Sequence, residues 1–125
     1  LYPKMISFIT SFLKDSKDLL ELYCGCGSFT LPLASKFNKV FATENNRHAI
    51  KLLFKSIELN NISNIKTARL SDDETALALN KKRMFRRLKN IDLTSYNLQQ
   101  DHLYPTTCQE KLYQLKDQQF HLNLF

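Results

Sequence analysis

The feature that most constrains the fold is a pair of glycines two positions apart, Gly25 and Gly27, which are the only glycines among 125 residues. The mostly apolar segment before them, residues 18–23, predicts a short strand. After them, Ser28 offers a helix N-cap, and apolar residues at helical spacing predict a helix over residues 29–37. Because glycine carries no side chain, the backbone can turn sharply between these elements and come close to a ligand.

A carboxylate ends the next predicted strand, which covers residues 39–44 and finishes at Glu44. In open α/β sheets, backbone amides at such a glycine turn approach a nucleoside, and an acid after the second strand accepts its ribose hydroxyls. Dinucleotide sites need a third glycine, but Thr30 occupies that position here. The spacing from Glu21 to the two glycines is instead typical of S-adenosylmethionine sites. A tight turn that binds no ligand remains the alternative.

The rest of the chain alternates between helix and strand patterns. Apolar spacing predicts helices over residues 4–14 and 46–59, and Ser71 with Glu74 forms a capping box before a third helix. Residues 65–70 predict a third strand. This alternation predicts an α/β, Rossmann-like fold with a parallel sheet and right-handed crossovers, incomplete because only the first three strands and their helices are recognisable. The residues expected on the apolar face of the helix over 46–59 are Ile50, Leu53, Phe54 and Ile57.

Basic residues gather in one short segment of a chain whose formal net charge is +6. Lysines and arginines occupy six positions from Lys81 to Lys89, with Met84, Phe85 and Leu88 between them. A helix with this pattern would present a basic face that attracts nucleic-acid phosphates through the release of counterions. A solvated helix face that binds nothing explains the same charges equally well, so both interpretations stay open.

Cysteines and histidines predict neither a disulfide framework nor a metal site. There are three cysteines, and two of them lie in the glycine turn, so they make no disulfide framework. The absence of such a framework is typical of a protein in the reducing cytoplasm. The histidines at positions 48, 102 and 121 are isolated, and no second pair has the spacing of zinc ligands. We also expect no membrane span, because no apolar run is long enough to cross a bilayer.

Two groups of motifs resemble a known family. Residues 20–29, with the sequence LELYCGCGSF, closely resemble the LELYCGNGNF signature of S-adenosylmethionine-dependent RNA uracil-5-methyltransferases, and residues 42–44 resemble the end of that family's second strand. Residues 85–88 and 91–96, FRRL and IDLTSY, are similar to the FNRL and IDLKSY of its tRNA branch. The resemblance extends over residues 5–96.

The resemblance implies that Tyr23, Ser28 and Glu44 line a pocket for S-adenosylmethionine, which Gly25 and Gly27 shape. It also implies that the intact protein transfers a methyl group to carbon 5 of the T-loop uridine of tRNA. Ser28 replaces the asparagine that is usual in the family, so we expect a weaker hydrogen bond to the cofactor there.

The catalytic residues of that family are not recognisable in this chain. In the family, a cysteine thiolate attacks carbon 6 of uracil and a glutamate later removes the proton from carbon 5. The nucleophile lies in a Ser-Cys-Asn-Pro setting beyond an Asp-Pro-Pro-Arg strand end, whereas Cys108 lies in Thr-Thr-Cys-Gln. We therefore assign no catalytic residue and expect a fragment that is inactive alone. The alternatives are a non-catalytic nucleic-acid-binding adaptor with the same fold and a small-molecule methyltransferase, against which residues 85–96 argue.

The chain is expected to divide into residues 1–98, the cofactor-binding half of a methyltransferase domain, and a divergent tail over residues 99–125. A fourth strand is due in this tail, but residues 101–105 predict it poorly, and residues 107–119 predict only a weak helix. Codons for residues 101–108, when read one nucleotide later, permit an apolar strand followed by two prolines. We therefore expect the tail to be out of frame.

Overall fold

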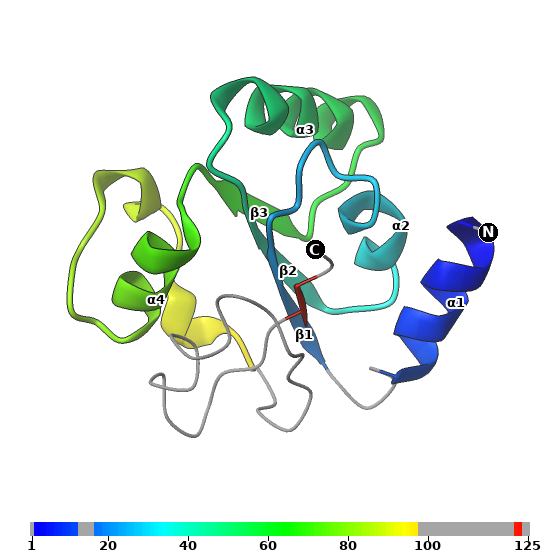
Figure 1. Cartoon of the computed structure of the whole chain (residues 1–125), viewed down its shortest axis with the longest axis horizontal. Helices are drawn as coiled ribbons and strands as arrows, with labels where there is room; N and C mark the ends of the chain where they lie inside the picture. The colour runs from blue at the N-terminus through cyan, green and yellow to red at the C-terminus, as the bar shows by residue number, and fades with distance from the viewer. Residues whose placement is uncertain (1, 13–16, 98–121, 124–125) are drawn as a thin grey trace.

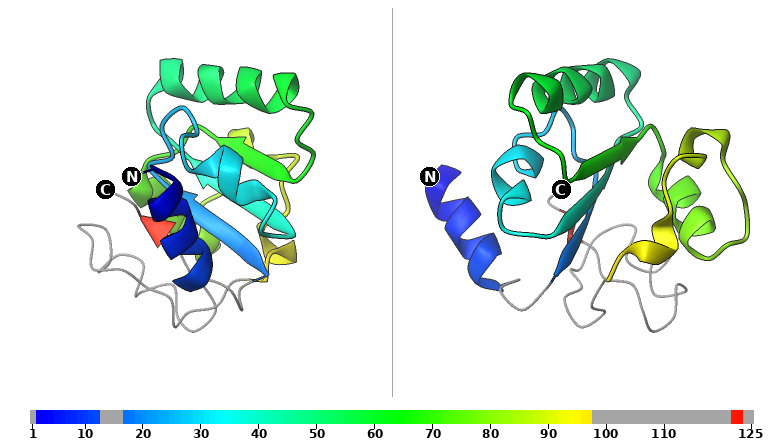
Figure 2. Two further views of the ribbon diagram at one scale, coloured as in Figure 1. Left: turned by 90° about the vertical axis from the view of Figure 1, so that its right-hand side faces the viewer. Right: turned by 180° about the vertical axis from the view of Figure 1, so that it is seen from behind.

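The computed structural model describes residues 2–12, 17–97 and 122–123, and it shows a parallel sheet with helices on both sides. In Figures 1 and 2, α1 and α2 lie on one side of this sheet and α4 lies on the other. In chain order the elements are α1 (Tyr2–Phe12), β1 (Asp18–Leu22), α2 (Thr30–Ala34), β2 (Lys39–Thr43), α3 (Arg47–Leu59), β3 (Ile65–Ala68), α4 (Asp72–Leu79), the 3₁₀ turns η1 (Arg86–Leu88) and η2 (Leu93–Ser95), and β4 (Leu122–Asn123).

The strands stand in the order β3-β2-β1-β4, and all three neighbouring pairs are parallel. The last residues of β1, β2 and β3 lie in one row, because Leu22 pairs with Thr43 and Thr43 pairs with Ala68. Every residue of β1 is buried, as expected for a central parallel strand that is covered on both faces. The segments that follow these three strands therefore meet at a single edge of the sheet.

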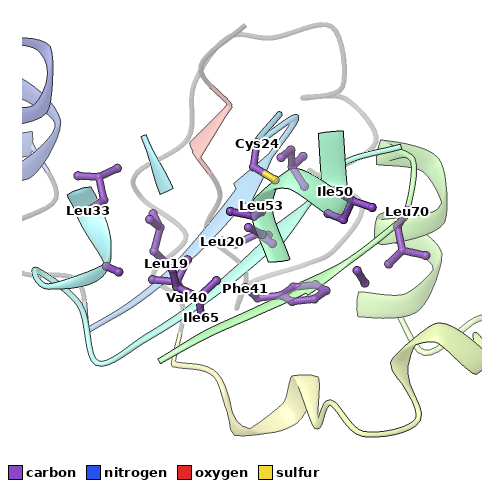
Figure 3. Close-up of a cluster of buried hydrophobic side chains, with 14 of the residues drawn as sticks. Leu19, Leu20, Cys24, Leu33, Val40, Phe41, Ile50, Leu53, Ile65 and Leu70 are labelled. Carbon is purple, nitrogen blue, oxygen red and sulfur yellow. The ribbon is translucent and has the colours of Figure 1, made fainter. Parts of the chain in front are cut away.

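The core forms around β1 and β2, whose apolar residues have almost no exposed surface. Figure 3 shows these side chains packed together with residues of α2, α3 and β3. The labelled members include Leu19, Leu20, Val40, Phe41 and Leu53, each at most 2% exposed. This packing holds the sheet and the first helices as one unit, and it carries the edge at which the candidate site lies.

Most predicted elements are confirmed, but the first helix after the glycine turn differs from the prediction. It runs only from Thr30 to Ala34, its N-cap is Phe29, and Ser28 is exposed rather than capping. Helical hydrogen bonding already begins at the turn, because the Leu31 amide donates to the carbonyl of Gly27 at 3.1 Å. Ser28 thus precedes the N-cap residue Phe29 and does not occupy the N-cap position itself.

The basic segment is not an α-helix, contrary to the prediction, and its helical part is the single 3₁₀ turn η1. α4 ends at Leu79 with Asn80 as its C-cap, and Lys81 adopts a left-handed conformation with φ of 58°. The Lys81 amide donates to the carbonyl of Ala78 and the Lys82 amide to that of Leu77, which is the Schellman pattern that terminates a helix. Phe85 is then buried against the core, so the segment folds back instead of presenting one basic face.

Part of the expected tail lies outside the described residues, including the strand at residues 101–105 and the helix over 107–119. The described portion of the tail is β4, which pairs with β1 through Glu21 and Leu122 and through Leu22 and Asn123. The sheet therefore gains a fourth parallel strand at residues 122–123, a position that the sequence patterns had not indicated.

Candidate functional site

The glycine turn is built as an extension of the β1–β2 ladder. The Cys24 amide donates to the carbonyl of Thr43 at 3.0 Å, two residues beyond Leu22, the last paired residue of β1. The Gly27 amide then donates to the carbonyl of Cys24 at 3.1 Å and closes the turn. Tyr23, Gly25 and Gly27 all have positive φ, of 58°, 59° and 100° respectively. The backbone therefore reverses over a short distance at the carboxyl edge of the sheet.

The two glycines are needed for different reasons. A Cβ placed on Gly27 would lie 2.5 Å from Cδ1 of Leu53, so this glycine lets α3 pack directly against the turn. A Cβ on Gly25 would meet nothing within 4 Å, so the space beside this residue is open. Gly25 is required for its left-handed backbone, and the open space next to it can accept part of a ligand.

Glu44 joins the end of β2 to the glycine turn. Its Oε1 accepts a hydrogen bond from the Gly25 amide at 3.0 Å, and its Oε2 accepts one from the Asn46 amide at 2.8 Å. A carboxylate offers about four acceptor positions, so each oxygen keeps one for another donor. Among the described residues, the carboxyl group is thus held in place by two amides, with an acceptor position left on each oxygen.

The other two predicted site residues flank the turn. Tyr23 is 39% exposed and Ser28 is also exposed, so both side chains border the solvent on the surface that carries the turn. The geometry brings Gly25 and Glu44 into direct contact across 19 residues and fixes Gly27 against α3. The roles of Tyr23 and Ser28 toward a cofactor stay predictions.

A buried pair beneath the turn was missed among the site residues. Glu21 is 1% exposed and accepts a hydrogen bond from the hydroxyl of Thr30, which is fully buried. Burial raises the pKa of Glu21 to about 7, and the hydrogen bond from Thr30 opposes this shift. The signal in the sequence was a single carboxylate inside an otherwise apolar strand segment, at residues 19–23. The pair links β1 to the start of α2 and so supports the turn from below.

The buried cysteine of the glycine turn does not have the surroundings of an activated nucleophile. Cys24 is buried, and its burial together with the charges of Glu21 and Glu44 raises the pKa of its thiol far above neutral pH. A thiol in such a setting stays protonated and unreactive. Cys26 is free and exposed in the turn.

The segment that resembles IDLKSY, residues 91–96, lies at the amino-terminal ends of β1 and β2. Asp18 accepts hydrogen bonds from the Lys39 amide at 3.1 Å and from the Asn97 amide at 2.6 Å. The Lys39 ammonium donates to the Ser95 hydroxyl at 3.1 Å and lies 4.9 Å from the centre of the Tyr96 ring. Burial and the charge of Asp18 raise the pKa of Tyr96 to about 12. This segment therefore fastens the chain to the sheet, at the end of the strands that faces away from the glycine turn.

Neither a metal cluster nor a membrane span is found among the described residues. Residues 2–12, 17–97 and 122–123 contain no cluster of three or more histidine, cysteine, aspartate or glutamate side chains that could hold a metal ion. Within the same ranges, no helix has the length and apolar character needed to cross a membrane.

Sequence comparisons connect the chain to one family. A family model described as tRNA (Uracil-5-)-methyltransferase matches residues 1–121. The chain is similar to the tRNA/tmRNA (uracil-C(5))-methyltransferase of a Nitratiruptor species, at 50% identity over 106 residues, which cover 84% of this chain and 29% of the relative. It is 51% identical over 94 residues to the protein of the same name from Teredinibacter turnerae, covering 74% and 26%. The chain thus spans less than a third of the length of these relatives.

Solved structures of methyltransferases share this architecture. Coclaurine N-methyltransferase bound to N-methylheliamine and SAH matches 57% of this chain and 22% of its own, with a TM-score of 0.52 and 21% identity. An S-adenosylmethionine-dependent methyltransferase from Clostridium acetobutylicum ATCC 824 matches 58% and 31%, with a TM-score of 0.54 and 21% identity. These likenesses confirm the predicted α/β, Rossmann-like methyltransferase fold, and they show that only part of it is present.

Proposed function

The chain belongs to the tRNA (uracil-5-)-methyltransferase family, and on this basis we propose that it is the S-adenosylmethionine-binding part of an enzyme that methylates carbon 5 of the T-loop uridine of tRNA. The observation that carries the proposal is the hydrogen bond of 3.0 Å from the Gly25 amide to Glu44. This bond holds the predicted ribose-binding carboxylate against the predicted cofactor turn, although 19 residues separate them.

The residues of the turn fit the cofactor in a consistent way. Glu44 keeps an acceptor position on each oxygen for a ribose hydroxyl, and the open space at Gly25 leaves room for the methionine part. Gly27 fixes the turn on α3, while Tyr23 and Ser28 border the pocket. S-adenosylmethionine, when bound, supplies the methyl group. The chain's own contribution is to bind and orient it.

We further propose that the chain does not transfer the methyl group by itself. The family's mechanism needs a cysteine thiolate and a glutamate base at the uracil ring, as the resemblance implies. Cys24 is buried and its pKa is raised, so it does not supply that thiolate. Residues 1–98 then act as the cofactor-binding half of a catalytic domain, followed by a divergent tail over residues 99–125. A cytoplasmic location, expected from the cysteine content, stays a prediction.

Titration of the purified chain with S-adenosylhomocysteine in a calorimeter tests the proposal. We expect saturable binding with one site per chain, alongside a circular dichroism spectrum of a folded α/β protein. A second assay follows the transfer of labelled methyl groups from S-adenosylmethionine to a T-arm RNA hairpin, and we expect none from this chain alone. A folded chain that does not bind S-adenosylhomocysteine would contradict the proposed cofactor binding and favour a non-catalytic nucleic-acid-binding adaptor. Methyl transfer to the hairpin would contradict the proposal that the chain is inactive by itself.

A further inference from the structure

A second candidate site lies beside α3, at the outer side of β3. It is a cavity of about 440 Å³ between the first half of α3 and the carboxyl end of β3. Neither Glu44 nor the glycine turn lines it, so it is distinct from the proposed cofactor site. The residues that line the cavity are Arg47, Ile50, Lys51 and Phe54 from α3, Thr67, Ala68 and Arg69 from β3 and the residue after it, and Arg87 from η1.

Half of these lining residues are cationic, and none is acidic. Arg47 and Lys51 come from the first turns of α3, while Arg69 and Arg87 come from segments that follow β3. Arg87 is fixed at the wall, because its guanidinium donates to the carbonyl of Arg69 and pairs with Glu74 at 3.0 Å. Three segments therefore bring four cationic side chains to the cavity, of which Arg87 is paired with Glu74. The other three favour an anionic ligand.

An exposed aromatic ring stands among these cations. Helical spacing predicted Phe54 on the core face of α3, but the structure leaves it 49% exposed at the cavity, which corrects that prediction. Free phosphate needs no aromatic partner. A ring beside a basic groove is instead the combination with which proteins hold single-stranded nucleic acids, since the base stacks on the ring while the cations hold the phosphate.

From these observations we propose that the cavity beside α3 is a phosphate-binding site for one nucleotide of a single-stranded polynucleotide. The phosphate lies between Arg47, Lys51 and Arg69, and the adjoining base stacks on Phe54. The polynucleotide as the source of the phosphate rests in part on the proposed function, while recognition of the phosphate itself rests only on the cavity.

The test measures the binding of a labelled oligouridylate of about eight nucleotides, a typical site size for such grooves, to the full chain by fluorescence anisotropy over a range of salt concentrations. Lys51→Gln is compared with Lys55→Gln, which removes the same charge from the same helix at an exposed position that does not line the cavity. We expect Lys51→Gln to weaken binding and to lower the slope of log K against log salt by about 0.7. Lys55→Gln should leave both values close to those of the unaltered chain.

Two further variants separate binding from folding. Phe54→Ala should weaken oligonucleotide binding roughly fivefold or more, as expected for the loss of one stacked base. Leu52→Ala truncates a comparably exposed residue of α3 outside the cavity and should change nothing.

The outcomes divide clearly. Equal losses for Lys51→Gln and Lys55→Gln would overturn the proposal, because they would show a general surface charge effect. Uridine monophosphate or inorganic phosphate that displaces the oligonucleotide at equal concentration would overturn the polynucleotide as the source. Oligonucleotide binding that survives in Glu44→Ala, with the losses described above, supports the site independently of the cofactor. Binding of S-adenosylhomocysteine without any binding of the oligonucleotide would refute this inference and leave the proposed function intact.

Discussion

Replacing Glu44 by alanine removes the carboxylate on which the proposed cofactor site depends. In the folded chain this group accepts the amides of Gly25 and Asn46 at 3.0 and 2.8 Å, so the change affects both the turn and any bound ribose. A hydrogen bond to a charged group contributes about 1.5–3 kcal/mol when buried. Glu44 is only half-buried and water can replace it at the two amides, so we expect the free energy of unfolding to fall by about 1–2 kcal/mol in total.

Glu44→Ala should weaken cofactor binding by more than the lower stability of the folded chain can explain. Two ribose hydroxyls would lose their acceptors in a site that holds them away from water, which costs about 1–3 kcal/mol, or roughly 5- to 150-fold in affinity. Glu44→Gln should fall between the alanine variant and the unaltered chain. Its amide keeps one acceptor oxygen but turns an N–H group toward either Gly25 or Asn46, whose amides also donate.

The assay is calorimetric titration with S-adenosylhomocysteine at a temperature where urea denaturation shows each variant to be folded. Glu58→Ala is the matched control, because it removes the same charge from an exposed position on α3. A Glu44→Ala chain that is folded and binds S-adenosylhomocysteine as tightly as the Glu58→Ala chain would refute the assignment of Glu44 to the ribose. Equal losses in both variants would instead attribute the effect to net charge.

Two predictions concern the support of the turn. Gly27→Ala should lower the free energy of unfolding by roughly 2–4 kcal/mol, because its Cβ would clash with Leu53 and its backbone has a positive φ. Gly25→Ala should lower it by only about 1–2 kcal/mol, because only the positive φ opposes the change. Urea denaturation measures both values, and the reverse order would contradict this reasoning. Burial raises the pKa of Glu21 from 4.5 to about 7, so the folded chain binds the Glu21 proton more tightly than the unfolded chain does. The stabilisation that comes from this protonation is complete below pH 4.5 and is lost as the pH rises toward 7, which lowers the free energy of unfolding by roughly 3 kcal/mol. Glu21→Gln should remove that part of the pH dependence. If the unfolding free energy of the Glu21→Gln chain varied with pH from 5 to 8 just as that of the unaltered chain does, Glu21 would not titrate in this range.

Local patterns in the sequence were sufficient to predict the first three strands and the position of the turn. β1 is buried throughout, β2 and β3 are buried at all but one residue each, and short, mostly apolar segments indicate such burial. The glycine turn and the capping box of Ser71 and Glu74 depend on residues within a few positions of one another, and the structure confirms both. Glu44 could be anticipated as well, because strands that run parallel bring the residues after them to one edge.

Contacts between distant segments decided what the patterns could not show. Ser28 is not the N-cap of α2, because the glycine turn passes directly into the helix. The basic segment folds back because Phe85 is buried in the core. Phe54 has the helical spacing of a core residue, but α3 meets the outer strand of the sheet, where no further strand covers the ring within the described residues.

The cavity beside α3 exists only because residues from position 47 to position 87 converge there, and no spacing along the chain encodes that convergence. Periodicity indicates which side of an element is apolar, since that depends on neighbours in sequence. Whether a given side chain is covered, paired or left at a cavity wall depends on the elements that pack against it, and these are chosen by the tertiary fold.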